Sequence, residues 1–338
     1  MNRRIALVLA MSCGWLLAGA ARADVTLTGA GATFPKPLYD KWSAEYNRQH
    51  PEVRINYQGI GSGGGIKQIT EKTVDVGATD GPMSDKQLEK APGILHIPMT
   101  LGAVVPVYNL PQVDAAKPLI FSGEVLAELY LGKITKWNDP KLAKLNPGVH
   151  LPDRAVTIVH RSDGSGTTYI FADYLSVVNK EWATKVGKNT SVNWPTGVGG
   201  KGSEQVAAQV KHLPGAIGYV ELAYATQNKL PVANLKNAAG NFVAPSPESV
   251  SQAMATATIP DDFRFSMVNA PGEGSYPIAG ASWVLLYEKQ GDAKKGKMLV
   301  NFLKWCVTEG QKTSPKLAYA PLPDEVQQRA VKLLETVK

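Results

Sequence analysis

Three glycine- and hydroxyl-rich segments have the residue types needed to hold an anion. They span residues 29–34, 59–65 and 161–167, with the sequences GAGATF, GIGSGGG and RSDGSGT. Glycine lets bare backbone approach a ligand closely, and serine and threonine add hydroxyl donors. The third segment also carries Arg161, whose planar guanidinium suits an oxyanion, and Asp163, which is placed to orient it. A purely structural ion pair between these two residues is the alternative.

Each segment follows a β-rich run and precedes apolar residues at helical spacing. A turn of this kind lies at the carboxyl end of a strand and at the amino end of a helix, where open α/β sheets bind ligands. The first N–H groups of the helix lack intrahelical partners there, and the helix dipole is positive. A simple helix cap is the alternative for any one segment. Three such segments in one chain favour a shared anion site.

The alternation of strand and helix patterns predicts an α/β fold with mainly parallel sheets. Two apolar strands, at 104–108 and 282–287, flank a stretch long enough to form a lobe of its own. We interpret them as hinge crossings. The predicted lobes are then 24–104 with 277–338 for lobe 1, and 105–276 for lobe 2, with the ligand in the cleft between them.

The N-terminus has the pattern of an export signal. Arginines at positions 3 and 4 precede an uncharged, mostly apolar stretch at 5–20 and an A-x-A site at 21–23. We predict a signal peptide over 1–23, cleaved after Ala23, and a periplasmic protein. A lipoprotein anchored at Cys13 is the alternative, although the residues before it form a poor attachment signal. Cleavage would leave Cys306 alone, without a disulfide, as a buried residue of an amphipathic helix.

Charge and motif content argue against several classes of protein. The predicted signal holds three arginines and no acid, so its removal lowers the formal net charge from +7 to +4. The basic residues are spread along the chain, which argues against a nucleic-acid-binding face. The five histidines lack the spacing of a local metal site.

Hydrolase and nucleotide-binding motifs are incomplete. Neither Ser62 nor Ser165 lies in a G-x-S-x-G nucleophile elbow. The run at 197–203 is similar to a P-loop, but Pro195 occupies the first glycine position and Gly202 separates the lysine from the hydroxyl residue. We therefore interpret this run as a surface turn or a secondary contact near the cleft.

Five motifs in order resemble one known family. They are TGAGATFP at 28–35, YQGIGSGGG at 57–65, DVGATD at 75–80, RSDGSGT at 161–167 and PGAIGYVE at 214–221. Together they are similar to the periplasmic phosphate-binding proteins (PstS) of Pst-type phosphate importers, from the mature start to the PLP segment at 321–323. The resemblance implies a type II-like two-lobed periplasmic binding protein whose lobes are joined by two hinge strands. It also implies a monomer without catalysis or cofactor that delivers inorganic phosphate to the membrane permease of an ABC importer.

The resemblance implies a ligand set that combines backbone donors, hydroxyl groups and one cation, with Asp163 orienting that cation. One position in the second segment departs from the family, because many members have a serine where this chain has Gly63. His160 stands where relatives are often basic, so a positive charge there would depend on pH. The implied phosphate ligands are Thr33, Phe34, Ser62, Asp80, Arg161, Ser165, Gly166 and Thr167.

Asp80 is the ligand that would select the anion. A carboxylate repels an anion unless the anion brings a proton to share, and phosphate keeps a proton near neutral pH whereas sulfate keeps none. Asp80 would therefore give high selectivity for phosphate over sulfate. A helix cap after Thr79 is the alternative role of Asp80. The alternative functions are a binding protein for another oxyanion, such as sulfate, molybdate or a phosphonate, and a secreted phosphatase, for which the chain offers neither nucleophile nor metal ligands.

Overall fold

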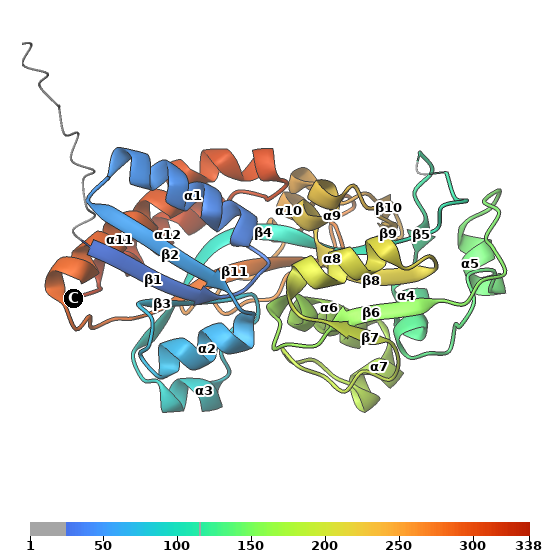
Figure 1. Ribbon diagram of the computed structural model, residues 1–338, viewed down its shortest axis with the longest axis horizontal. Helices are drawn as coiled ribbons and strands as arrows, with labels where there is room; N and C mark the ends of the chain where they lie inside the picture. Colours follow the sequence, from blue (N-terminus) through green and yellow to red (C-terminus); the bar gives the residue numbers. More distant parts are fainter. Residues whose placement is uncertain (1–24, 115) are drawn as a thin grey trace, which may run out of the picture.

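The structure is a computed structural model that describes residues 25–114 and 116–338. The predicted signal peptide and its cleavage site after Ala23 lie outside the described residues. The described chain forms one eight-stranded mixed sheet and one three-stranded sheet, with helices on both faces (Figure 1). The strands are β1 (Val25–Gly31), β2 (Val53–Gly59), β3 (Val76–Thr79), β4 (Ile94–Tyr108), β5 (Ile120–Phe121), β6 (Thr157–Arg161), β7 (Val198–Gly200), β8 (Ala216–Glu221), β9 (Asn234–Lys236), β10 (Phe242–Val243) and β11 (Ala279–Tyr287).

The large sheet has the strand order β2-β1-β3-β11-β4-β8-β6-β7. β4 is long enough to serve two sets of neighbours: its residues 94–103 pair with β11, and its residues 104–108 pair with β8. We call β2, β1, β3, β11 and residues 94–103 of β4 the first half of the sheet. The remainder of β4 with β8, β6 and β7 is the second half.

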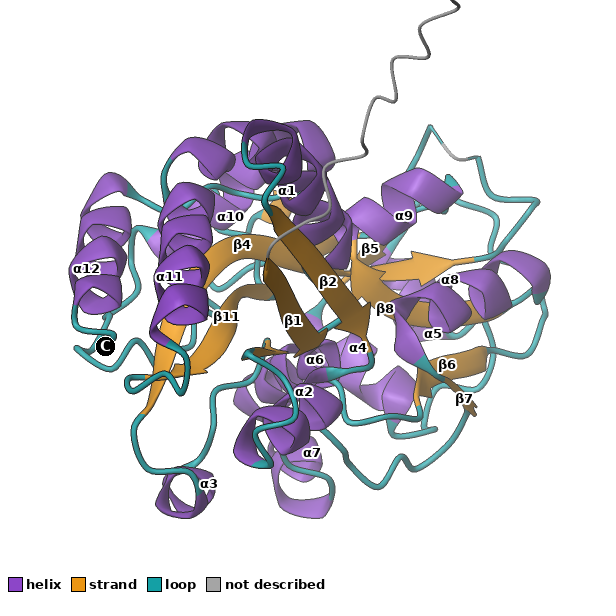
Figure 2. Cartoon of the chain, turned by 60° about the vertical axis from the view of Figure 1, so that its left-hand side comes forward, coloured by secondary structure: helices purple, strands orange, loops and turns teal. Residues whose placement is uncertain are grey.

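The pairing is mixed in both halves. β1 pairs in parallel with β2 and β3, and β6 pairs in parallel with β7 and β8. β11 is antiparallel to both of its neighbours, and β4 is antiparallel to β8. The predicted parallel units are therefore present, and the antiparallel strands β4 and β11 lie side by side at the centre of the sheet (Figure 2).

One of the two expected hinge crossings is placed differently. Residues 104–108 do continue β4 into the second half, as expected. Residues 282–287 pair only with β3 and with residues 94–100 of β4, so the expectation that this strand crosses between the halves is wrong. β11 starts at the crossing point, where Ala279 pairs with Ala103. The lobe boundaries at 104 and 277 stay a prediction.

The helices pack against the sheet through apolar stripes on one face. Leu38, Trp42 and Tyr46 of α1 are buried, and the Trp42 indole donates a hydrogen bond to the Gly310 carbonyl at 2.7 Å. Cys306 is buried on α11, as predicted from its helical spacing.

The helices are α1 (Lys36–Gln49), α2 (Ser62–Thr70), α3 (Asp85–Lys90), α4 (Gly123–Tyr130), α5 (Pro140–Leu145), α6 (Gly166–Val178), α7 (Lys180–Lys185), α8 (Gly202–His212), α9 (Leu222–Asn228), α10 (Pro247–Met254), α11 (Ala293–Val307), a 3-10 helix (Glu309–Leu317) and α12 (Asp324–Glu335).

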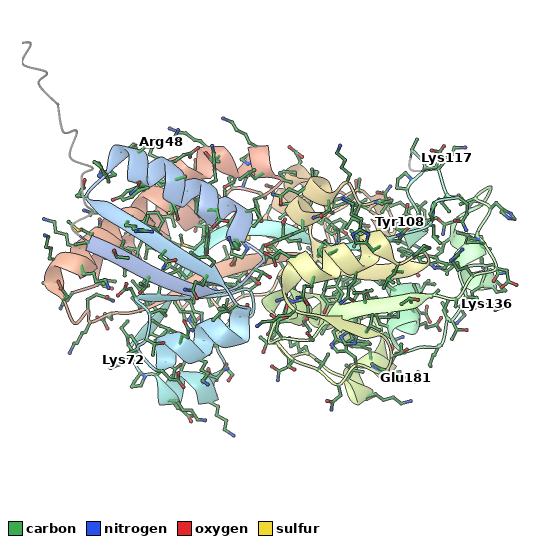
Figure 3. The ribbon with its side chains drawn as sticks, in the orientation of Figure 1. Arg48, Lys72, Tyr108, Lys117, Lys136 and Glu181 are labelled. Carbon is green, nitrogen blue, oxygen red and sulfur yellow. The ribbon has the colours of Figure 1, made fainter. Side chains whose placement is uncertain are left out.

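The charged side chains that Figure 3 labels point outward from separate parts of the molecule. Arg48, Lys72, Lys117 and Lys136 are all exposed, and they come from α1 and from three different loops. This distribution matches the spread of basic residues along the sequence. None of the described helices is long and apolar enough to cross a lipid bilayer.

Candidate functional site

Five strand ends meet where the two halves of the sheet face each other. β1, β2 and β3 end there in the first half, and β6 and β7 end there in the second. Helices α1, α2, α6 and α8 begin in the same region, each within a few residues of a strand end. All three predicted strand–turn–helix units therefore contribute to one place, although β1 extends to Gly31 and takes up the start of the first predicted loop.

Ser62 connects the two halves at this place. Its hydroxyl oxygen accepts hydrogen bonds from the N–H of Asp80 at 3.1 Å and from the N–H of Gly166 at 3.0 Å. Ser62 and Asp80 follow strands of the first half, whereas Gly166 is the first residue of α6 in the second half. A Cβ atom on Gly166 would lie 2.5 Å from both the Asp80 nitrogen and the Ser62 hydroxyl oxygen. Glycine is therefore required for this close approach.

Arg161 and Asp163 form a forked ion pair. Nε of Arg161 donates to Oδ1 of Asp163 at 2.8 Å, and Nη2 donates to Oδ2 at 2.6 Å. The remaining nitrogen, Nη1, lies 3.5 Å from the Thr167 hydroxyl and 3.4 Å from the Ser203 hydroxyl. Only 1% of the Arg161 side chain is exposed. Burial alone would raise the pKa of Asp163, but hydrogen bonding and charge from Arg161 outweigh it and hold that pKa below its usual value.

Thr33 joins the Arg161 cluster from the first half. Its hydroxyl lies 2.9 Å from the Ser203 hydroxyl, and the Ser203 N–H donates to it at 3.4 Å. Phe34 is fully buried and precedes α1, where the first N–H groups have no carbonyl partner within the helix. Ser165 uses its hydroxyl to cap α6, accepting from the Thr168 N–H at 3.1 Å. Its side chain thus has the simple capping role that the sequence left open.

The sequence did not identify Ser203 and Ser282 as parts of this site. Ser203 is the last residue of the run at 197–203, which we interpreted as a surface turn or a secondary contact near the cleft. It lies at the start of α8 and is buried. The strand–glycine–helix pattern around Ser203 could have indicated a fourth unit of the site, but the run was compared with a P-loop, which it does not match. Ser282 donates to Oδ1 of Asp80 at 2.8 Å from the middle of β11. In the sequence, the only indication of a role for Ser282 was a polar residue within an otherwise apolar strand.

Asp80 does not cap a helix, so that alternative is wrong. The next helix, α3, is capped by Ser84. The Asp80 carboxyl instead accepts from Ser282 and lies 3.5 Å from the Ser62 hydroxyl. Burial raises its pKa to about 7, against the opposing effects of the Ser282 hydrogen bond and the charge of Arg161. This group therefore changes its charge close to neutral pH.

The two positions that depart from the family pattern have local explanations. The N–H of Gly63 donates to the Gly164 carbonyl at 2.9 Å, and a Cβ on Gly63 would lie 3.1 Å from the Gly164 Cα. A side chain at position 63 would thus crowd this contact between the halves. His160 stacks on Trp194 with ring centroids 4.8 Å apart. Burial lowers the pKa of His160, despite an opposing hydrogen bond with the Arg161 carbonyl, so it adds little positive charge at neutral pH.

Within residues 25–114 and 116–338, no three histidine, cysteine, aspartate or glutamate side chains are grouped so that they could hold a metal ion. The site offers a buried guanidinium held by Asp163, several hydroxyl groups, helix N-termini and the carboxyl group of Asp80. This combination suits a small oxyanion that carries a proton.

Comparisons with known proteins agree with this arrangement. The PBP superfamily domain matches residues 18–309. A phosphate-binding protein PstS of Xylella fastidiosa (strain Temecula1) is 50% identical over 302 residues, which cover 89% of this chain and 82% of the relative. A phosphate-binding protein PstS of Methanocaldococcus jannaschii is 40% identical, covering 93% of this chain and 87% of the relative.

Solved structures of similar fold include two proteins with low sequence identity. A phosphate-binding protein from Stenotrophomonas maltophilia has a TM-score of 0.69 at 17% identity, covering 91% of this chain and 93% of that one. A putative phosphate ABC transporter substrate-binding protein from Clostridium perfringens, with bound phosphate, has a TM-score of 0.65 at 18% identity, covering 88% of this chain and all of that one. These likenesses confirm the predicted two-lobed α/β fold of periplasmic binding proteins.

Proposed function

Because this chain belongs to the PstS family of phosphate-binding proteins, we propose that it binds inorganic phosphate in the periplasm and delivers it to the membrane permease of an ABC importer. In this proposal the protein is a monomer that acts without catalysis or cofactor. The predicted signal peptide over 1–23 supports the location.

One observation carries the proposal: the halves of the sheet bury the Arg161 guanidinium and the Asp80 carboxyl group within one cluster of hydrogen-bond donors. Arg161 supplies the cation, and two of its nitrogens are already held by Asp163. Its third nitrogen and the nearby hydroxyls remain for the anion, together with the N–H groups at the starts of α1 and α6. The proposed phosphate ligands are Thr33, Phe34, Ser62, Asp80, Arg161, Ser165, Gly166 and Thr167.

Asp80 supports selectivity for phosphate over sulfate. When ionised, its carboxylate accepts a hydrogen bond from a protonated phosphate oxygen but repels fully ionised sulfate. Ser282 fixes Oδ1 at 2.8 Å and leaves Oδ2 on the side of Ser62. The carboxylate therefore presents one oxygen to the proposed ligand position.

Contacts across the halves support a closing motion as the delivery signal. The hydrogen bonds of Gly166 to Ser62 and of Ser203 to Thr33 each join one half to the other. A ligand held by groups from both halves stabilises the closed arrangement relative to an open one. In this proposal the permease recognises the closed form.

Calorimetry on the mature protein tests the function directly. We expect titration with phosphate at pH 8 to give tight one-to-one binding and titration with sulfate to give far weaker binding. p-Nitrophenyl phosphate, incubated in parallel, should release no nitrophenol. Equal binding of sulfate and phosphate would overturn the proposed selectivity, and release of nitrophenol would favour a secreted phosphatase instead.

A further inference from the structure

Three tyrosine hydroxyls donate to three successive backbone carbonyls of the loop between β1 and α1. This loop contains Thr33 and Phe34, two of the proposed ligands. Short hydrogen bonds from a hydroxyl to a backbone carbonyl fix both the position and the orientation of the peptide group. The three contacts are Tyr57 Oη to Ala32 O at 2.6 Å, Tyr224 Oη to Thr33 O at 2.6 Å, and Tyr319 Oη to Phe34 O at 2.7 Å.

Each carbonyl belongs to the same peptide group as the N–H of the next residue. A hydrogen bond accepted by the carbonyl polarises that group and makes its N–H a stronger donor. The bond from Tyr224 to the Thr33 carbonyl therefore strengthens the N–H of Phe34. The bond from Tyr319 has no such effect, because the residue after Phe34 is Pro35, which has no N–H.

Tyr224 alone among the three comes from the second half. Tyr57 lies in β2 and Tyr319 follows the 3-10 helix, and both pack with the first half. Tyr224 lies on α9, directly after β8, and it is 4% exposed. Its hydrogen bond to Thr33 therefore exists only when the two halves are together.

The Tyr224 hydroxyl is a donor throughout the physiological pH range. Burial raises its pKa, and the nearby charge of Glu204 raises it further, so the proton stays on the oxygen. The hydroxyl also lies 3.3 Å from Oε1 of Glu204. Its single hydrogen goes to the Thr33 carbonyl, since that contact is the shorter one.

We infer that Tyr224 is a positioning residue for the anion: from across the cleft, its hydroxyl holds and polarises the peptide group between Thr33 and Phe34. The Phe34 N–H thus reaches full donor strength only in the closed form, which couples closure to affinity. This inference rests on the proposed function, in which phosphate occupies the site and accepts a hydrogen bond from that N–H.

The chain offers a matched pair of variants to test it. Tyr224→Phe and Tyr319→Phe each remove one short, buried hydrogen bond to the same loop, but only Tyr224→Phe weakens a donor. Calorimetry and stopped-flow measurements should show that Tyr224→Phe raises the phosphate dissociation constant about three- to tenfold. The change should come from faster dissociation with an unchanged association rate, because the bond forms after encounter. Tyr319→Phe should change the dissociation constant less than about twofold, although it lowers stability.

The amide proton of Phe34 gives a second readout that a purely structural role would not change. In the phosphate-bound protein, nuclear magnetic resonance should show this proton moving upfield in Tyr224→Phe and staying in place in Tyr319→Phe. Wild-type affinity of Tyr224→Phe, or equal loss of affinity in both variants, overturns the inference while leaving the proposed function intact. Failure of the wild-type protein to bind phosphate overturns both.

Discussion

At the scale of single residues, the proposed function gives Arg161 the role of binding the anion and Asp80 the role of selecting it. Arg161 provides the attraction, and it is buried with its charge largely balanced by Asp163. Asp80 is buried with no cation of its own in direct contact, which is why its pKa rises to about 7. In the proposed function, Arg161 is therefore the group that favours any oxyanion, and Asp80 is the group that distinguishes a protonated oxyanion from a fully ionised one.

Replacing Arg161 with alanine should weaken phosphate binding by roughly 2–5 kcal/mol, because a buried charged donor set loses one partner and the Asp163 carboxylate is left unpaired. Calorimetry measures the loss. Arg154→Ala is the control, since Arg154 is an exposed arginine of the same half. A variant at position 161 that still binds within a factor of two of wild type would contradict the assigned role.

Asp80→Asn should narrow the difference in affinity between phosphate and sulfate, and the effect should depend on pH. Since the pKa of Asp80 lies near 7, the wild-type carboxyl is mostly ionised at pH 8 and mostly protonated at pH 5. Protonation removes the repulsion of sulfate, so wild-type selectivity should decrease as the pH falls through 7. In Asp80→Asn the sulfate affinity should vary little over this range. Competition titrations at pH 5 and pH 8 measure both trends, and a pH-independent wild-type selectivity would contradict them.

At the scale of elements, the site consists of strand–turn–helix units whose ends converge. The sequence predicted three of these units, because a strand, a glycine turn and a helical stripe are all local patterns. It interpreted the run that joins β7 to α8 as a surface turn or a secondary contact near the cleft, and this run brings the Ser203 hydroxyl within 2.9 Å of the Thr33 hydroxyl. It also missed Ser282, since the contact with Asp80 spans 202 residues and leaves no local trace. Local sequence patterns thus identified the loops of the site. Its remaining residues are brought in by contacts between segments that are far apart in the sequence.

Gly166→Ala tests the convergence of these elements. The new methyl group would lie 2.5 Å from atoms of Ser62 and Asp80, so it should hold the halves apart and weaken phosphate binding by at least about 2 kcal/mol. The unfolding temperature without phosphate should not fall, because alanine favours a helix more than glycine does. Gly291→Ala is the control, since a Cβ there meets no atom within 4 Å. Unchanged phosphate binding by Gly166→Ala would show that the halves do not need this close approach.

At the scale of the whole molecule, the sequence predicted the α/β class and most of the helical faces. It could not predict that β4 continues through both halves or that β11 lies between β3 and β4, because strand order depends on pairing between distant segments. The expectation that residues 282–287 cross between the halves failed for this reason: their apolar character fits any central strand.

Phosphate should stabilise the whole molecule, because it binds the folded form only. At a concentration about 1,000 times its dissociation constant, the gain in unfolding free energy is about 4 kcal/mol, which should raise the unfolding temperature by several degrees. Differential scanning calorimetry at pH 8 measures the shift, and equal sulfate serves as the control. Small-angle scattering should show a smaller radius of gyration with phosphate. Equal shifts with both anions would argue for a general salt effect.

The place of β11 in the sheet also determines when the protein can fold. β3 ends at Thr79 and β4 begins at Ile94, yet the strand that joins them comes from Ala279–Tyr287. While a ribosome is still making the middle of the chain, the first half lacks the strand that lies between β3 and β4 and cannot bury its core. Contacts between such distant segments also form slowly. We therefore expect the newly made chain to stay unfolded until it is nearly complete, and an unfolded chain is the form that the proposed export to the periplasm requires.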